Sequence, residues 1–373
     1  MPITIDHLRN YAVVRTMFAP TTLVRAIRRL GFVQADPIRA PARAQDLILR
    51  HRVKGYRAGE LERRYPRVAI DEDSLVNYGF LPREHLALMH PRVAARAWDL
   101  ATKRRAADVL AFVREHGHVH PRQVDAHFGH GRVQNYWGGT SNASTQLLDA
   151  MHYRGLLRVV RRDAGTRIYE VATHVASDDS TVAQMQRVMA LLQLVVRTYA
   201  PLPASSLTYL MRLLRCGVPH AAVHAQAALR ALREQLGCVT LNGVSWYWPG
   251  DENPGSLRYA PDEQVRLLAP FDPVVWDRRR FELLWGWTYK FEAYTPAPRR
   301  KFGYYALPLL RGAQVLGWGN LSVVNGKLET TFGYAEQTPP RDRGYRTALA
   351  AELGGIEWFL GLHDAAFVNN AVG

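Results

Sequence analysis

Residues 142–155 read Asn-Ala-Ser-Thr-Gln-Leu-Leu-Asp-Ala-Met-His-Tyr-Arg-Gly, and residues 156–172 continue Leu-Leu-Arg-Val-Val-Arg-Arg-Asp-Ala-Gly-Thr-Arg-Ile-Tyr-Glu-Val-Ala. Apolar residues at helical spacing predict a helix over the first part, and Gly155 predicts its end because glycine is favoured just after a helix. The second part alternates around a turn at residues 163–165, which is typical of a β-hairpin. Together they predict a helix followed by a wing.

The surrounding sequence extends this unit and repeats it. Helices are expected at 107–116 and 121–128, so that three helices precede the hairpin, as in a winged helix. The same order recurs with helices at 182–199, 204–214 and 220–236, followed by an Asn242-Gly243 hairpin turn. A first copy is expected within residues 4–70, where Thr21 or Thr22 caps a helix that ends at Gly31.

From about residue 265 the apolar period changes to two, with glycine and aromatic punctuation. Strands are expected over 289–294, 304–310, 314–318, 321–325 and 327–332, followed by a helix over 347–360. The predicted fold class is therefore α+β: three tandem winged-helix modules at 1–100, 101–178 and 179–250, and a barrel-like antiparallel β domain with a terminal helix at 262–373.

The charge of the chain indicates its partner. Its 373 residues carry 48 Lys+Arg against 33 Asp+Glu, a formal charge of +15. Residues 1–70 alone hold 14 cations and 5 anions, a net of +9, and only five of all the cations are lysines. Because guanidinium groups bind two phosphate oxygens at once, a basic and Arg-rich front half favours nucleic acid over an anionic membrane surface.

Several classes of protein are disfavoured by the same sequence. No apolar run reaches the ~18 residues of a membrane span, and the N-terminus lacks the pattern of a secretion signal. The two cysteines, Cys216 and Cys238, have no metal-binding or disulfide spacing. We therefore expect a cytoplasmic monomer without a cofactor, a metal, a membrane or an obligate protein partner.

One short polar segment is a candidate for chemistry. Gln34 and Asp36 are two apart in a stretch that Pro37 favours as extended, so their side chains are expected on the same side. Five cations follow within residues 39–54, and they are expected to keep the carboxylate ionised so that it can hold a water or take its proton. Taken alone, the pattern is more typical of a polar turn after a helix.

Resemblance to a known family changes that weighting. Gln34-Ala35-Asp36, followed by Arg43 and a Leu-Ile-Leu-Arg run, resembles the Gln-apolar-Asp motif of the YcaQ-like branch of the AlkZ family. These are winged-helix DNA glycosylases that unhook interstrand crosslinks. A longer block at 269–286 and 294–309 is similar to the C-terminal signature of that family in order and spacing, so the resemblance covers nearly the whole chain.

The resemblance implies a DNA glycosylase that hydrolyses the N-glycosidic bond of N7-alkylated purines, including crosslinked ones, in double-stranded DNA. Cationic character would develop at the deoxyribose C1′, as in other glycoside cleavage. Asp36 would stabilise it and accept a proton from the attacking water, which Gln34 would orient. No lysine lies in the motif, so we expect a monofunctional enzyme that leaves an abasic site.

The expected DNA contacts are basic or aromatic residues near the motif and in a predicted hairpin at 296–303, whose tip would probe a groove. They are Arg39, Arg43, Arg50, Arg52, Lys54, Tyr56, Arg299, Arg300 and Lys301. For each cation, an ordinary solvated surface charge is the alternative.

A second function remains open from the sequence alone. Repeated winged helices fit a non-enzymatic DNA-binding protein, a transcription regulator or a repair scaffold, as well as they fit an enzyme. Gln34, Asp36 and the large β domain favour the enzyme. Two further carboxylates, Asp272 and Asp277, could form an acid–base pair, but their proline-rich surroundings favour a structural turn with arginine ion pairs.

Overall fold

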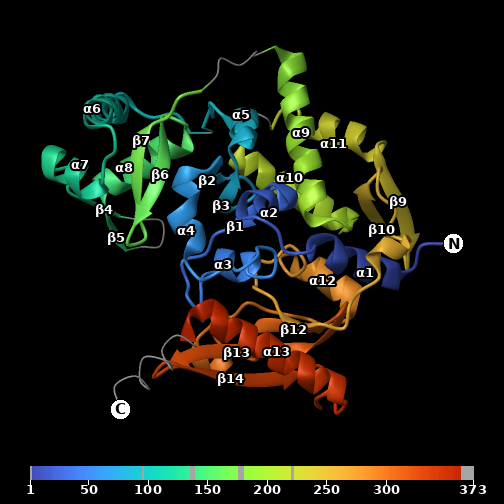
Figure 1. Ribbon diagram of the computed structural model, residues 1–373. Helices are drawn as coiled ribbons and strands as arrows, with labels where there is room; N and C mark the ends of the chain where they lie inside the picture. The colour runs from blue at the N-terminus through green and yellow to red at the C-terminus, as the bar shows by residue number, and fades with distance from the viewer. Residues whose placement is uncertain (1, 95, 135–138, 175–179, 220–221, 363–373) are drawn as a thin grey trace, which may run out of the picture. The chain divides into compact units, whose positions relative to one another are not determined.

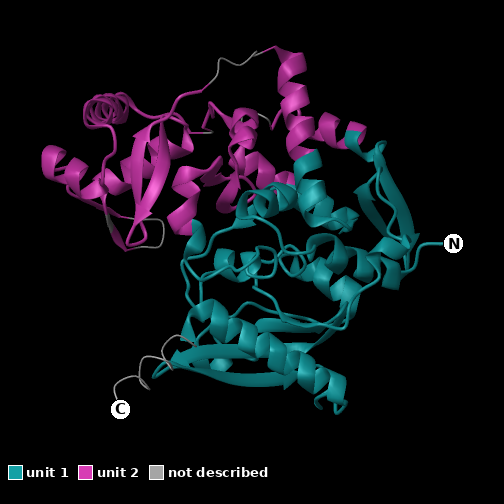
Figure 2. Cartoon of the chain, in the orientation of Figure 1, with its two compact units in different colours: residues 1–61, 193–210, 232–373 teal, residues 62–192, 211–231 magenta. Residues whose placement is uncertain are grey.

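The computed structural model describes residues 2–362 except 95, 135–138, 175–179 and 220–221, and within them it holds thirteen α-helices and several antiparallel sheets (Figure 1). The fold is therefore α+β. The chain forms two compact units, coloured separately in Figure 2. Unit 1 contains residues 1–61, 193–210 and 232–373, and unit 2 contains residues 62–192 and 211–231. Each unit is assembled from segments that are not contiguous in sequence.

Unit 1 begins with three helices and ends with an open sheet covered by a helix. Its elements are α1 (Ile5–Thr16), α2 (Leu23–Leu30), β1 (Val33–Gln34), α3 (Ala44–Leu49), β8 (Leu202–Pro203), β9 (Leu236–Leu241), β10 (Val244–Pro249), β11 (Val265–Leu267), α12 (Arg278–Trp285), β12 (Leu307–Arg311), β13 (Gln314–Val324), β14 (Lys327–Tyr334) and α13 (Arg343–Leu360). Figure 1 shows α13 lying along the sheet formed by β11 to β14.

Helix α1 contributes to two apolar clusters of unit 1. Leu8, Tyr11 and Ala12 pack with Trp246 and Trp248 of the β9–β10 hairpin. In the second cluster, Val13 packs with buried residues of α12, of the loop that precedes it, and of the β12 region. The N-terminal helix therefore joins the hairpin to the C-terminal sheet.

Unit 2 contains a helix-rich core with a wing. Its elements are β2 (Ile70–Ser74), β3 (Tyr78–Pro82), α5 (Leu86–Met89), α6 (Leu100–His116), α7 (Pro121–Phe128), β4 (Arg132–Gln134), β5 (Thr140–Asn142), α8 (Ala143–Tyr153), β6 (Leu157–Asp163) and β7 (Thr166–Val171). Val109, Leu148 and Met151 meet Leu157 and Tyr169 of the β6–β7 hairpin in one buried cluster. The hairpin is thus the third wall of the core that α6 and α8 form.

Four helices each contain a boundary between the units. They are α4 (Glu60–Arg64), α9 (Thr181–Tyr199), α10 (Ala204–Gly217) and α11 (Ala225–Arg233).

The predicted order of helices and hairpins is confirmed in both repeats. The β6–β7 and β9–β10 turns carry positive φ at Ala164-Gly165 and Asn242-Gly243, as tight hairpin turns require. The predicted helix at 220–236 is shorter, since α11 begins at Ala225, and residues 220–221 lie outside the described part of the chain. Thr22 caps α2 through the backbone N–H of Arg25, as expected.

The C-terminal prediction needs three corrections. The sheet is not barrel-like: in the described residues it is open, in the order β11-β12-β13-β14. The strand expected at 289–294 is irregular chain, and its first residue, Tyr289, stacks on the ring of Trp287. The strands expected at 314–318 and 321–325 are one strand, β13, which pairs with β14 from Gly317 to Val324.

None of the described helices is both long and apolar enough to span a bilayer.

Candidate active site

The end of α2 fixes the entry into the candidate site. Gly31 has a φ of 77°, and a Cβ at this position would stand 2.6 Å from Leu194 Cδ1. Glycine suits this position because other residues are strained in this left-handed backbone, and a Cβ would also force the end of the Leu194 side chain to shift. The chain can therefore leave α2 abruptly and run into β1, which ends at Gln34.

Gln34 and Asp36 are both largely withdrawn from solvent, with 4% and 8% of their surfaces exposed. The Asp36 backbone N–H donates to Gln45 Oε1 on α3 at 3.2 Å, and Asp36 Oδ1 accepts the backbone N–H of Ile38 at 2.9 Å. The Asp36 loop is thus tied to α3 and closed on itself. The polar-turn interpretation describes its local geometry, but its burial is unusual for a solvated turn.

Burial raises the pKa of Asp36 above the ordinary aspartate value, and the hydrogen bond from Ile38 opposes that shift only in part. Desolvation is the largest influence on the pKa of Asp36, and no described cation is paired with its carboxylate. The expectation that neighbouring cations dominate the ionisation of this carboxylate is therefore wrong. A carboxylate that is poorly solvated is a stronger proton acceptor than one at the surface.

Two further polar atoms at this site lack partners. Gln34 Oε1 and the Tyr305 hydroxyl are buried, and neither makes a hydrogen bond within the described residues. The pKa of Tyr305 is raised well above its usual range, first by burial and then by the negative charge of Asp36. Asp36 and Tyr305 are therefore close enough to interact electrostatically. A water or a ligand in the site would satisfy both atoms.

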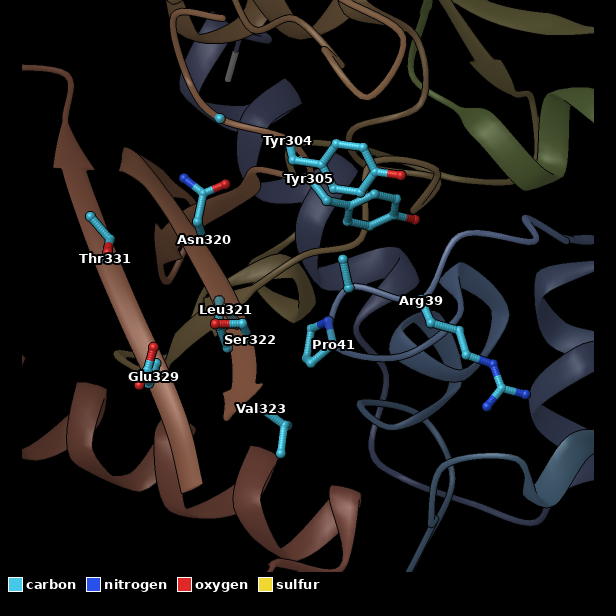
Figure 3. A pocket seen from close by; sticks show the side chains of 12 residues that line it. Arg39, Pro41, Tyr304, Tyr305, Asn320, Leu321, Ser322, Val323, Glu329 and Thr331 are labelled. Atoms are coloured by element: carbon cyan, nitrogen blue, oxygen red, sulfur yellow. The ribbon is translucent and has the colours of Figure 1, made fainter. Parts of the chain in front are cut away.

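A cavity of about 610 Å³ has Tyr305 in its wall. Gln34 and Asp36 are not among the residues that line it, and Asp36 is linked to it through its electrostatic interaction with Tyr305. One side consists of residues 39–41, which follow the Asp36 loop, and of Tyr304 and Tyr305; strands β13 and β14 form the other side (Figure 3). Gly303 shapes this wall because it has a φ of 112° and a Cβ there would be 2.4 Å from the Asn320 side chain. The volume is within the range of small-molecule sites.

Sequence reasoning assigned no role to Tyr304, Tyr305 or Asn320. The adjacent tyrosines lie within the C-terminal family block, but their aromatic type is as common in cores as in sites. Only the fold brings residues 303–305 next to the segment that begins at Gln34.

The residues expected to contact DNA fall into two groups. Arg39, Lys54, Arg299 and Lys301 are exposed, and Arg43 and Arg300 are half-buried. Arg300 donates through Nε to the Thr295 carbonyl at 2.8 Å, and its guanidinium lies 5.0 Å from the centre of the Tyr304 ring. Residues 297–299 form a short 3-10 turn instead of the predicted hairpin tip, because no strand flanks them.

The other three residues are structural, and the expectation for them is corrected. Arg52 has 0% of its surface exposed and makes a bidentate ion pair with Asp272, at 2.8 and 3.1 Å. The Arg50 side chain is also buried and pairs with Glu352 of α13. The Tyr56 hydroxyl donates to Asp46 at 2.7 Å. Phosphates cannot reach these groups while these pairs exist.

Asp272 and Asp277 do not form an acid–base pair. Asp272 holds Arg52 and accepts the Val274 N–H at 3.0 Å, while Asp277 caps α12 through the Arg280 N–H at 3.0 Å. The structural interpretation of this turn is confirmed. Elsewhere in the described residues, no group of three or more His, Cys, Asp or Glu side chains is placed to hold a metal ion.

A family model described as DNA glycosylase AlkZ-like matches residues 27–357. The match includes Gln34, Asp36 and every residue that lines the cavity. No solved structure matches the chain.

Proposed function

The chain belongs to the family of AlkZ-like DNA glycosylases, and from that premise we propose that it hydrolyses the N-glycosidic bond of N7-alkylated purines in duplex DNA, including purines in interstrand crosslinks. The family match supports glycosylase activity and a DNA substrate. The alkylated-purine specificity is our proposal from the resemblance of the Gln34–Asp36 motif and the C-terminal block to the YcaQ-like branch of the family.

The chemistry that the site supports follows from the substrate. A purine alkylated at N7 is positively charged and leaves without being protonated, so the enzyme has to stabilise the cation that develops at C1′ and supply a nucleophile. Asp36 would do both: its carboxylate would face the cation and accept a proton as water attacks C1′. The products would be the free alkylated base and an abasic site.

Gln34 would orient that water. Its buried Oε1 is without a partner in the described residues, so it is available to accept a hydrogen bond from a water. The motif at 34–36 contains no lysine, which supports a monofunctional hydrolase instead of an enzyme that forms a Schiff base.

The observation that carries the proposal is the burial of an unpaired Asp36 carboxylate beside a cavity whose wall contains Tyr305. Arg39, at the edge of that cavity, and the exposed Lys54, Arg299 and Lys301 would contact phosphates. We propose further that residues 1–100, 101–178 and 179–250 act as three winged-helix modules that hold the duplex.

The test uses duplexes that contain 7-methylguanine or a nitrogen-mustard crosslink, with abasic sites revealed by alkaline cleavage. The wild-type protein should release the base, and Asp36→Asn should lower the single-turnover rate by at least ~10²-fold, because general-base catalysis contributes about that much. Its affinity for DNA should change little. Asp262→Asn, a carboxylate paired with Arg266 away from the cavity, is the matched control.

Undiminished release of 7-methylguanine by Asp36→Asn would refute the assignment of Asp36. If the wild-type protein cleaves neither duplex but footprints a specific operator, the non-enzymatic DNA-binding function is the correct one.

A further inference from the structure

One wall of the cavity near Asp36 carries four polar side chains from two paired strands. On β13 and β14, Asn320 pairs with Thr331 and Ser322 pairs with Glu329. Because cross-strand partners point to the same face of a sheet, these four side chains share one face, and all of them line the cavity. Figure 3 shows Glu329 on this wall, with Arg39 on the opposite side of the cavity and extending away from the strands.

Glu329 is unexpected in this position. It is exposed, and no ion pair or hydrogen bond partner is found for it within the described residues. The chain carries a net charge of +15 and binds a polyanion in our proposal, so an unpaired carboxylate at the site opposes binding of the backbone. An unpaired carboxylate would instead favour a ligand that carries a positive charge.

Tyr304 is a second group at the cavity that would attract a positive charge. Its side chain is 45% exposed at the cavity, whereas Tyr305 beside it is buried. The face of an aromatic ring attracts cations, and the planar guanidinium of Arg300 already lies over the Tyr304 ring. Because Arg300 occupies one face of the ring, a flat cationic base would have to stack on the other face to make the same interaction.

We propose that the Tyr304 ring and the Glu329 carboxylate select positively charged purines, so that the cavity distinguishes an N7-alkylated base from an undamaged one by its charge. This inference rests on the proposed function, since the cavity is taken as the seat of the base that leaves. Tyr304 and Glu329 are binding groups in this arrangement, and Asp36 and Gln34 remain the groups that act on C1′.

The test measures two quantities that respond independently. The first is the affinity for a 7-methylguanine duplex relative to an identical undamaged duplex, which requires no catalysis. The second is the single-turnover excision rate on 7-methylguanine and on its ring-opened formamidopyrimidine, which keeps the methyl group and lacks the positive charge.

Glu329→Gln and Tyr304→Leu should each lower the preference for the 7-methylguanine duplex by roughly 3- to 10-fold, the size of one cation–π or ion-pair contact. The excision rate on 7-methylguanine should fall with it, and the rate on the neutral lesion should not. Tyr304→Phe should keep the preference because it keeps the ring. Affinity for undamaged DNA should be unchanged or, for Glu329→Gln, slightly higher.

The controls are matched residues outside the cavity. Tyr209 is 40% exposed and stacks on Trp276, and Glu336 is an exposed carboxylate beyond the end of β14. Tyr209→Leu and Glu336→Gln should leave the preference unchanged. All four positions are exposed, and melting temperatures within about 2 °C of the wild type would show that the variants fold.

The possible failures are distinguishable. An unchanged preference in both Glu329→Gln and Tyr304→Leu, with normal excision, overturns this inference and leaves the proposed function intact. A charge preference without excision supports the inference and refutes the proposed function. Absence of any preference in the wild-type protein overturns the inference.

Discussion

At the scale of single residues, Asp36 combines two properties that oppose each other. Burial makes its charged form costly, and the same burial makes the carboxylate a better proton acceptor. A position of this kind is expected at an active site, where reactivity is gained at some cost in stability. The pH dependence of excision and the stability of the fold should both show the effect of this raised pKa.

The excision rate should fall as the pH is lowered through a pKa above the ordinary aspartate value of about 3.9. Asp36 must be ionised to accept a proton, and burial raises the pKa at which it loses its own. Single-turnover rates between pH 4 and 8 would measure this, with DNA affinity measured at each pH as the control. A rate that increases on acidification would contradict a general base.

Asp36→Asn should be as stable as the wild-type protein at pH 7, or more stable. A raised pKa means that the folded state binds more protons than the unfolded state, so the ionised Asp36 carboxylate destabilises the fold. This destabilisation is fully present above the pKa of the folded state and is lost as the pH falls below the pKa of the unfolded state. Asparagine removes the charge and still accepts the Ile38 N–H. A variant that melts several degrees lower at pH 7 would contradict this.

At the scale of elements, the segment that follows α3 is held from two sides. Arg52 pairs with Asp272 in the loop before α12, and Arg50 pairs with Glu352 of α13. The Tyr56 ring stacks on Phe359 of α13, with ring centres 6.3 Å apart. Cations that look like a DNA-binding run in the sequence therefore join the N-terminal part of unit 1 to its C-terminal part.

Arg52→Met should lower the free energy of unfolding by about 3–5 kcal/mol, because it leaves the buried Asp272 carboxylate without its partner. Lys54→Met, two residues further on and exposed, should change it by less than ~0.5 kcal/mol. Urea denaturation of both variants would measure the difference. Equal, small effects would mean that the pair is not formed.

At the scale of the whole molecule, the total of 48 Lys+Arg overstates the number of cations available to DNA, since some of them are paired internally with carboxylates. In unit 2, Asp71 pairs with Arg83 at 2.6 Å and Asp73 with Arg92 at 2.9 Å. The number of phosphate contacts is therefore set by the unpaired surface cations and not by the total.

The salt dependence of DNA binding measures that number. Arg39→Ala and Lys301→Ala should each reduce the slope of log K against log salt by about 0.9, if each cation neutralises one phosphate. Arg311→Ala is the control, because Arg311 is already paired with Glu263 and Asp342. Unchanged slopes in the first two variants would remove those residues from the interface.

Predictions from the sequence were most reliable for helix caps and hairpin turns. Thr22 and Gly31 delimit α2, and the Asn242-Gly243 turn defines a hairpin, since caps and turns depend on residues only a few positions apart. The β2–β3 hairpin was missed because Asp71, Glu72 and Asp73 read as polar surface. Their burial depends on cations far along the chain, such as Arg162 for Glu72.

The sequence by itself determined the order of helices and hairpins, the family and the Gln34–Asp36 motif, because each of these is written in neighbouring residues or in contiguous blocks. Only the tertiary structure decided which cations remain free, why Asp36 has a raised pKa, and that Tyr305 approaches it. Burial and ion pairing depend on residues hundreds of positions apart, and a linear pattern does not contain them.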